Sequence, residues 1–415
     1  MRITLALTLL LALTATAQDA RVDRILKDVP LIDGHNDLPW EYRERVKNQL
    51  AKIDISQDQS KLEKPLHTDI PRLREGRVGA QFWSVYIPAS LKGADAVQTT
   101  LEQIDVVHRL AAIYPDTFQL ALTADDITRI HKSGKIASLL GMEGGHSINN
   151  SLATLRLMYD AGARYMTLTH SANNDWADSA TADPEHNGLT PFGKAVVGEM
   201  NRLGMLVDLS HVAPKTMHDA LDVTAAPVIF SHSSARALAG HPRNVPDDVL
   251  KRLQQNGGVV MVTFVPGFIS EKLRVYQSQR EAESARLKSL FSGEPQKVKA
   301  GVEAWEAANA RPVATLSDVA DHIEYIINVA GEDHAGIGGD FDGITTTPAS
   351  LSSVADYPKL FAELLRRGHS EEQLKKLAGL NVLRVMKQAE AVSARLRKER
   401  GPADVLIEDL DKKSE

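Results

Sequence analysis

Short apolar runs alternate with longer amphipathic stretches along most of this chain of 415 residues. One run, Val259-Val260-Met261-Val262, has no polar interruption, which is typical of a strand buried on both faces of a parallel sheet. Strands that alternate with helices favour a parallel α/β fold. The pattern predicts eight strands, at residues 30–34, 80–87, 136–143, 165–169, 206–209, 228–231, 259–264 and 335–340.

Eight strands separated by helices predict a (β/α)8 barrel of the TIM type, whose active site collects at the carboxyl ends of the strands. A doubly wound open sheet is the alternative. That fold usually carries a Gly-x-Gly-x-x-Gly turn after its first strand, and none follows residue 34 here. The pattern therefore favours the barrel.

The helical stretches carry boundary signals of their own. Thr315 and Asp318 have capping-box spacing before an apolar stripe, and Gly331 ends that helix. Residues 271–309, between the seventh and eighth strands, are rich in charged side chains and Gln. They are either a helical excursion over the barrel mouth or a solvated outer helix without a role at the site. Residues 370–400 are expected to form helices packed on the outside.

The first 17 residues have the pattern of a secretion signal. Met1-Arg2 precedes an apolar stretch over residues 5–13, and Ala15-Thr16-Ala17 is a small-x-small cleavage site. We therefore expect a signal peptide at 1–17, a single catalytic domain at 18–400 and a charged tail at 401–415. The expected location is outside the bacterial cytoplasm, in the periplasm or the medium.

Composition narrows the class of protein. A hydrophobic content of 43% and a charged content of 25% are those of a globular protein, and the net charge of −6 argues against nucleic-acid binding. Beyond the signal, no apolar run approaches the roughly 20 residues that span a bilayer, so no membrane anchor is expected. The absence of cysteine rules out disulfides and thiolate metal ligands.

Metal-binding residue types stand at the ends of most predicted strands. Because these ends meet in a barrel, side chains far apart in sequence are expected to converge. Nitrogen and oxygen donors without sulfur suit Zn²⁺ or a similar divalent ion. The candidates are His35 and Asp37, Glu143, His170, His211, His232, and Asp340.

Two ions account for these residues better than one. His35 and Asp37 are predicted to hold the first ion and His211 and His232 the second, with Glu143 bridging both. Ions about 3.5–4 Å apart share a water and lower its pKa, which gives a nucleophile near neutral pH. Asp340 is then expected to accept the proton of that water and return it to the leaving amine.

Other polar residues are expected to be structural. Asp33 and Asp208 lie inside predicted strands and are expected to orient their neighbours by hydrogen bonds. Five histidines fall on helical stretches away from strand ends and are expected to play no part in the site: His108, His131, His218, His322 and His369.

With these residues assembled, the chain resembles the membrane (renal) dipeptidase family of zinc metallopeptidases. Six motifs, in the family's order, carry the resemblance over nearly all of the chain beyond the signal. They are Asp33-Gly34-His35-Asn36-Asp37, Glu143-Gly144-Gly145-His146, Thr167-Leu168-Thr169-His170, Ser231-His232-Ser233-Ser234-Ala235, Arg243-Asn244-Val245 and Gly339-Asp340-Phe341-Asp342-Gly343.

The resemblance implies a metal-dependent hydrolase barrel that cleaves dipeptides, including those with a D- or dehydro residue at the C-terminal position. It implies two zinc ions, with Glu143 shared between His35 and Asp37 on one side and His211 and His232 on the other. It also implies that His170 contacts the substrate and the developing oxyanion, and that Arg243 binds the substrate carboxylate. Members of the family are commonly homodimers.

The chain also departs from the family. The chain has no cysteine for the disulfides of mammalian relatives and shows no lipid-anchor signal, and Phe268 stands where the resemblance implies a tyrosine near the substrate. Two alternative functions remain open. One is a related amidohydrolase acting on N-acyl-D-amino acids, lactams or lactones, and the other is an inactive barrel that serves as a binding protein.

Overall fold

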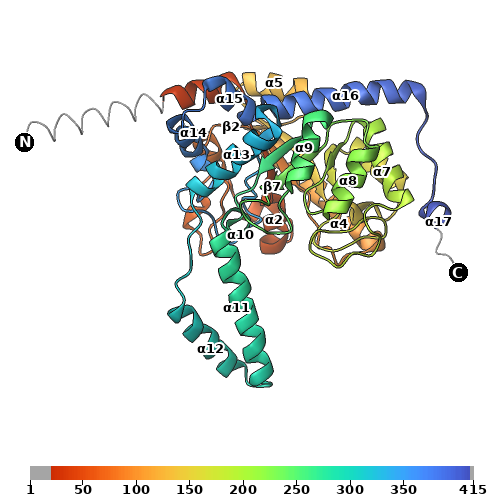
Figure 1. Ribbon diagram of the computed structural model, residues 1–415. Helices are drawn as coiled ribbons and strands as arrows, with labels where there is room; N and C mark the ends of the chain where they lie inside the picture. Colours follow the sequence, from red (N-terminus) through yellow and green to blue (C-terminus); the bar gives the residue numbers. More distant parts are fainter. Residues whose placement is uncertain (1–19, 412–415) are drawn as a thin grey trace, which may run out of the picture.

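Eight parallel strands close into a barrel in the computed structural model, which describes residues 20–411 (Figure 1). β2 pairs with both β1 and β4, and β1 pairs with β9, which completes the ring. The predicted (β/α)8 barrel is therefore confirmed. Its strands are β1 (Leu31–Asn36), β2 (Val78–Ser84), β4 (Ile136–Glu143), β5 (Ala163–Thr167), β6 (Leu206–Asp208), β7 (Ile229–Ser233), β8 (Val259–Val262) and β9 (Ala335–Ile337).

A ninth strand, β3 (Phe118–Leu120), lies outside the ring and was not predicted. It pairs with the first residues of β4, from Ile136 to Ser138, whereas β5 pairs with β4 from Leu140 onward. Three residues are too short for hydrophobic periodicity to register, so nothing in the sequence distinguishes β3 from a loop.

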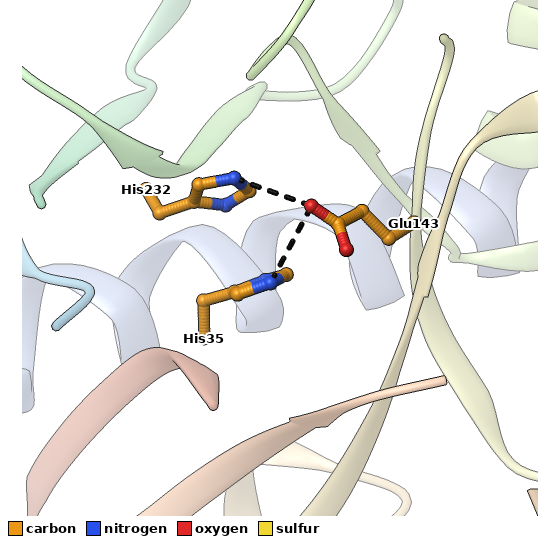
Figure 2. Close-up of side chains that lie close together, drawn as sticks. All are labelled: His35, Glu143 and His232. Atoms are coloured by element: carbon orange, nitrogen blue, oxygen red, sulfur yellow. Dashed lines mark ion pairs between the residues drawn. The ribbon is translucent and has the colours of Figure 1, made fainter. Parts of the chain in front are cut away.

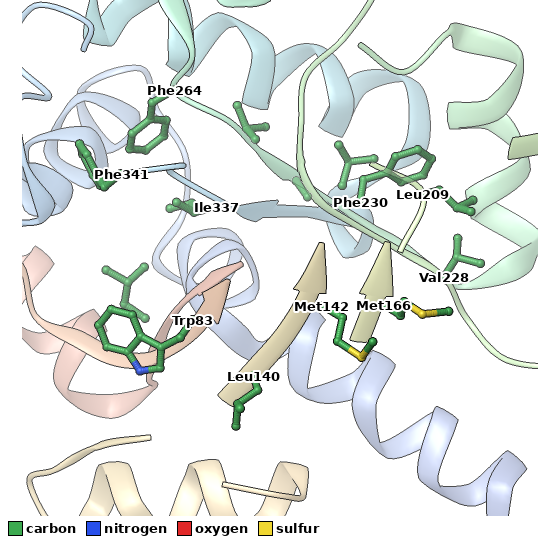
Figure 3. Packing of buried hydrophobic residues seen from close by; sticks show 14 of the residues in the cluster. Trp83, Leu140, Met142, Met166, Leu209, Val228, Phe230, Phe264, Ile337 and Phe341 are labelled. Carbon is green, nitrogen blue, oxygen red and sulfur yellow. The ribbon is translucent and has the colours of Figure 1, made fainter. Parts of the chain in front are cut away.

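Side chains of the strands alternate between two apolar layers. Ile32, Phe82 and Leu139 belong to a cluster in the barrel interior. Their chain neighbours Leu31, Trp83 and Leu140 belong to the layer beneath the helices. Figure 3 shows part of this outer layer, including Leu140. Because both faces are buried, apolar residues are favoured on both, and β8 shows this as the uninterrupted run Val259–Val262.

Helices surround the barrel, and the predicted capping box is present. Thr315 and Asp318 bond to each other's backbone N–H at the start of α13, which ends before Gly331. The surrounding helices are α2 (Leu38–Val46), α3 (Ile70–Glu75), α4 (Gly93–Ile113), α5 (Ala124–Lys132), α6 (Leu152–Asp160), α7 (Pro191–Leu203), α8 (Pro214–Val223), α9 (Asp247–Asn256), α10 (Pro266–Ile269), α13 (Leu316–Ala330), α14 (Tyr357–Arg366), α15 (Glu371–Lys375), α16 (Asn381–Glu399) and α17 (Ile407–Leu410).

The amino-terminal ends of the strands are covered by α5 and α16, which we call the floor of the barrel. Asn381 donates hydrogen bonds to the carbonyl of Ala335 at the start of β9, and Arg384 donates to Gly257 just before β8. Val382, Val385 and Met386 extend the interior cluster. The prediction of helices at 370–400 is correct, but their expected position on the outside is only partly so, because the first turns of α16 close the barrel interior.

The stretch at 271–309 forms a hairpin of two helices, α11 (Glu271–Leu290) and α12 (Pro295–Ala308). Figure 1 shows the hairpin projecting from the barrel on the side away from α16. It packs mainly on itself: the rings of Tyr276 and Trp305 lie 5.2 Å apart, and Arg280 pairs with Glu306. The predicted helical excursion is present, and it extends outward.

The two chain ends differ in how far the structure describes them. The predicted signal peptide at 1–17 lies outside the described residues. The charged tail is described as far as Asp411, which accepts hydrogen bonds from Thr190 and Phe192 at the start of α7. Within residues 20–411, no helix is both long and apolar enough to cross a bilayer.

Candidate active site

A cavity of about 450 Å³ opens at the carboxyl ends of the strands, and the residues singled out in the sequence gather there. His35 is fully buried beneath it. Within the described chain, no residue of α11 or α12 belongs to the lining, so the hairpin does not cover the mouth. The predicted residues that line the cavity are Asp37, Glu143, His170, His211, His232, Arg243 and Asp340.

Glu143 is at the centre of the histidines. Its Oε1 lies 3.5 Å from Nε2 of His35 and 3.4 Å from Nε2 of His232, and Figure 2 shows the three side chains converging. The same oxygen lies 3.0 Å from Nε2 of His211 and 3.7 Å from Nε2 of His170. Four imidazole nitrogens from four barrel segments therefore face one carboxylate oxygen.

The two predicted halves of the site lie on either side of Glu143. On one side, Nε2 of His35 is 3.2 Å from Oδ2 of Asp37, and Asp340 has a carboxylate oxygen within 4.8 Å of both. On the other side, Nε2 of His211 is 3.0 Å from Nε2 of His232. Glu143 contacts both halves, as a bridging ligand would, and the rings of His35 and His232 lie 3.9 Å apart behind it.

Hydrogen bonds beneath the cluster fix the tautomers of two histidines. Nδ1 of His35 lies 2.9 Å from the Tyr165 hydroxyl, whose own proton goes to the Gly34 carbonyl. Nδ1 of His232 lies 2.8 Å from Ser231 Oγ, which donates to Asp208 at 2.6 Å. Each Nδ1 thus donates, which leaves the Nε2 lone pair facing Glu143 and free for a metal.

Burial keeps the imidazoles of two candidate ligands, His211 and His232, in the neutral form. It lowers the pKa of His232 and of His211 well below the usual range, and the charge of Arg243 lowers both further. Burial opposes ionisation of Glu143 as well. The neighbouring His35 and His170 side chains, with the hydrogen bond to His211, nevertheless hold its pKa well below normal. An ionised carboxylate among neutral imidazoles is the ligand state that divalent metals require.

Asp340 has the opposite electrostatic setting. Burial raises its pKa well above the usual range, and the carboxylates of Asp37 and Glu143 raise it further. A carboxylate that gains a proton readily is suited to general acid and base chemistry.

The donors present fit a metal. Nε2 of His35 and Oδ1 of Asp37 are buried without a hydrogen-bond partner among the described residues, a costly state unless another group binds them. Two ligands about 2.0 Å from a tetrahedral ion are roughly 3.3 Å apart. The separations around Glu143, from 3.0 to 3.5 Å for His35, His211 and His232, agree with that value.

Arg243 is a buried cation at the edge of the same cavity. It is 3% exposed, and its guanidinium lies 5.5 Å from the ring of Phe268. Its hydrogen bonds go to Ser233 Oγ and the His232 carbonyl, and no described carboxylate is in ion-pair contact with it. Burial lowers the pKa of Arg243 to about 10, so it remains charged at neutral pH. Such a cation needs an anionic partner, and a ligand carboxylate is one.

Two site residues have backbone angles that side chains rarely adopt. φ is +70° at His211 and +61° at Asp340. Such strain costs about 1–3 kcal/mol per residue and is typical of functional positions. Here it directs both side chains into the cavity immediately after β6 and β9.

The structural roles predicted for Asp33 and Asp208 are confirmed. Asp33 accepts hydrogen bonds from the Gly339 and His35 N–H groups and from the Tyr357 hydroxyl. Asp208 holds Ser231, as described above. The sequence did not identify Tyr165, although its position two residues before the end of β5 places it in the interior layer. It also missed several lining residues, among them Trp40, Glu41, Glu44 and Tyr86.

Comparison with known proteins agrees with this geometry. The family model described as membrane dipeptidase (peptidase family M19) matches residues 19–400, and the chain belongs to that family. It is a metallo-dipeptidase, a hydrolase of peptide bonds. Dipeptidase verJ of Clonostachys rogersoniana is 40% identical over 385 residues, which cover 90% of this chain and 88% of that protein.

Solved structures share the fold. The probable dipeptidase PvdM from Pseudomonas aeruginosa aligns with a TM-score of 0.77 at 22% identity, covering 91% of this chain and 99% of that one. A metallo peptidase from Rhodobacter sphaeroides, liganded with a phosphinate mimic of L-Ala-D-Ala, aligns with a TM-score of 0.70 at 23% identity. That alignment covers 87% of this chain and 99% of the other.

Proposed function

We propose that this dipeptidase holds two zinc ions and hydrolyses dipeptides, including those with a D-residue at the C-terminal position. The observation that carries the proposal is the position of Glu143, whose Oε1 lies within 3.5 Å of His35, His211 and His232. His35, Asp37 and Glu143 would hold one ion. Glu143, His211 and His232 would hold the other.

Bound divalent ions would polarise the scissile carbonyl and acidify the attacking water. Asp340 faces this place from the end of β9, with its oxygen within 4.8 Å of the ligand atoms of His35 and Asp37. It would accept the proton of the water and return it to the leaving amine. His170, with Nε2 3.7 Å from Glu143 Oε1, is placed to donate to the oxyanion.

Arg243 would hold the C-terminal carboxylate of the substrate. Its planar guanidinium can make two parallel hydrogen bonds to a carboxylate, and it has no described carboxylate partner of its own. This contact favours substrates with a free C-terminus. Tolerance of a D-residue is supported by the Rhodobacter sphaeroides relative, which binds a mimic of L-Ala-D-Ala.

The test combines metal content with a substrate panel. Purified protein should contain about two zinc ions per chain by elemental analysis, and removing them should abolish turnover. The zinc-loaded enzyme should hydrolyse L-Ala-D-Ala and L-Ala-L-Ala, and turn over N-acetyl-D-alanine or a lactone poorly. Turnover of the N-acyl amino acid or the lactone without turnover of dipeptides would favour a related amidohydrolase. Turnover of no substrate in the panel would favour an inactive barrel that serves as a binding protein.

We also propose that the protein is exported and forms a homodimer. The signal pattern at residues 1–17 supports export, and the family resemblance supports the dimer. Expression of the full chain in a Gram-negative host should yield periplasmic protein that begins at Gln18, and light scattering should give twice the mass of the chain. Cytoplasmic, unprocessed protein or a monomeric mass would contradict the respective proposal.

A further inference from the structure

The wall of the cavity opposite Arg243 is formed by α2 and by the segment after β2. Trp40, Glu41 and Glu44 line the cavity from α2, and Tyr86 lines it from beyond β2. α2 follows β1, whereas Arg243 follows β7, and these two strands are separated by β8 and β9 in the ring. A dipeptide held at its carboxylate by Arg243 would therefore extend toward this wall.

Glu44 is a carboxylate on this wall without an ion-pair partner among the described residues, because the arginines on either side of it pair with other groups. Glu41, one turn earlier, is paired with Arg45, and Arg43 is paired with Glu102 at 2.7 Å. In the part of the chain that the structure describes, no Lys or Arg is in ion-pair contact with Glu44. Its negative charge is therefore available to a ligand at the cavity rim.

An aromatic surface leads from the histidine cluster to this rim. The ring of Tyr86 lies 5.0 Å from that of His170 and 4.8 Å from that of Trp40, which it meets edge to face. Both aromatic residues are half-buried. Aromatic faces favour the methylene stem of a basic side chain and attract its charged end.

We propose that Glu44, with Trp40 and Tyr86, selects dipeptides whose N-terminal residue carries a cationic side chain. The inference rests on the proposed function, which places the scissile carbonyl at Glu143. The α-amine is only one carbon away from that carbonyl, so it stays among the carboxylates at the bottom of the cavity. The side chain of the same residue extends further, along Tyr86 and Trp40, and a lysine-length chain brings its ammonium to Glu44.

The test compares three substrates that share their C-terminal residue: L-Lys-D-Ala, the uncharged L-norleucine-D-Ala and L-Glu-D-Ala. The zinc-loaded wild-type enzyme should prefer the lysine substrate to the norleucine one by about 5-fold in kcat/KM, since a partly exposed ion pair contributes up to about one kcal/mol. The glutamate substrate should be the poorest. The lysine preference should shrink as salt is raised, because salt screens an exposed pair.

Two variants and a control separate charge recognition from other effects. Glu44→Gln should bring the lysine-to-norleucine ratio to about 1, and Glu44→Lys should make glutamate better than lysine. Glu75→Gln, which neutralises an exposed glutamate on α3 outside the cavity, should keep the wild-type ratio. A ratio that Glu44→Gln leaves unchanged, or equal rates for lysine and norleucine in the wild type, would overturn the inference alone. No turnover of any dipeptide would overturn the proposed function.

Discussion

The two ends of the barrel are built from the same eight strands but have opposite chemistry. At the carboxyl ends, buried imidazoles and carboxylates face one another around Glu143, and some of their atoms have no partner among the described residues. At the floor, Val382, Val385 and Met386 of α16 close the interior with apolar contacts. The amino-terminal end thus stabilises the barrel, whereas the carboxyl-terminal end carries the chemistry.

This difference means that function and stability can be altered separately. Unpartnered buried polar groups cost stability, and the mouth tolerates them because the apolar interior and the floor hold the strands in place. Substitutions at the mouth should therefore change metal binding and turnover with little effect on folding. Substitutions at the floor should do the reverse.

The largest effect is expected from Glu143→Gln. A neutral amide cannot bridge two cations, so the variant should lose zinc and reduce kcat/KM by on the order of 10⁴-fold or more, since metal assistance contributes several kcal/mol. Elemental analysis and steady-state kinetics measure both. The control is Glu390→Gln, which keeps an acceptor for the Ala124 N–H at the floor and should leave zinc and turnover unchanged. Full zinc content in Glu143→Gln would remove the bridging role.

The next largest effect is expected from Asp340→Asn, a loss of roughly 10³-fold in kcat, which is within the usual range for a general acid or base. Asparagine tolerates the φ of +61° at this position, so the fold should persist. Zinc content should remain near that of the wild type. If the variant instead loses an ion, Asp340 is a metal ligand, and the proton must be transferred by another group.

The sequence predicted the metal-binding residues at the mouth of the barrel far better than the residues around them that orient those ligands or line the cavity. His35, Glu143 and His232 could be found because strand ends in a parallel barrel converge wherever they lie in the chain. Tyr165 could not, because a tyrosine in an apolar strand looks like core until its hydroxyl is seen 2.9 Å from His35 Nδ1. Glu44 could not either, since a glutamate on an amphipathic helix looks like solvent-facing surface until the cavity is seen beside it.

At the floor, Met386→Ala should cost about 2–5 kcal/mol of unfolding free energy, because it removes a side chain only 3% exposed from the interior cluster. Chemical denaturation measures the change. The value of kcat/KM at 25 °C should stay within 2-fold of the wild type. Leu380→Ala, at a neighbouring position that is 38% exposed, is the matched control and should cost far less. A large loss of turnover in Met386→Ala would break the separation of the two ends.

Tyr165→Phe should produce an intermediate effect at the mouth. It removes the acceptor for His35 Nδ1, and the loss of such a supporting hydrogen bond typically lowers metal affinity 10- to 100-fold. Competition with a zinc chelator measures this affinity. Tyr42→Phe removes the hydrogen bond from a buried hydroxyl to the Ile53 carbonyl, away from the cavity, and should leave zinc affinity unchanged. Equal losses in both variants would show a general effect of tyrosine hydroxyls on stability.

The smallest effect is expected from shortening the α11–α12 hairpin. The hairpin belongs to neither the mouth nor the floor of the barrel, because it contributes nothing to the cavity lining and packs mainly on itself. Replacing residues 281–302 by a short Gly-Ser turn keeps the contact between Tyr276 and Trp305 at its base. We expect zinc content to be unchanged and kcat/KM for L-Ala-D-Ala to stay within 2-fold. A loss above 10-fold with intact zinc would mean that the hairpin contributes to an active site, either in its own subunit or in a partner subunit. The cavity lining described above would then be incomplete.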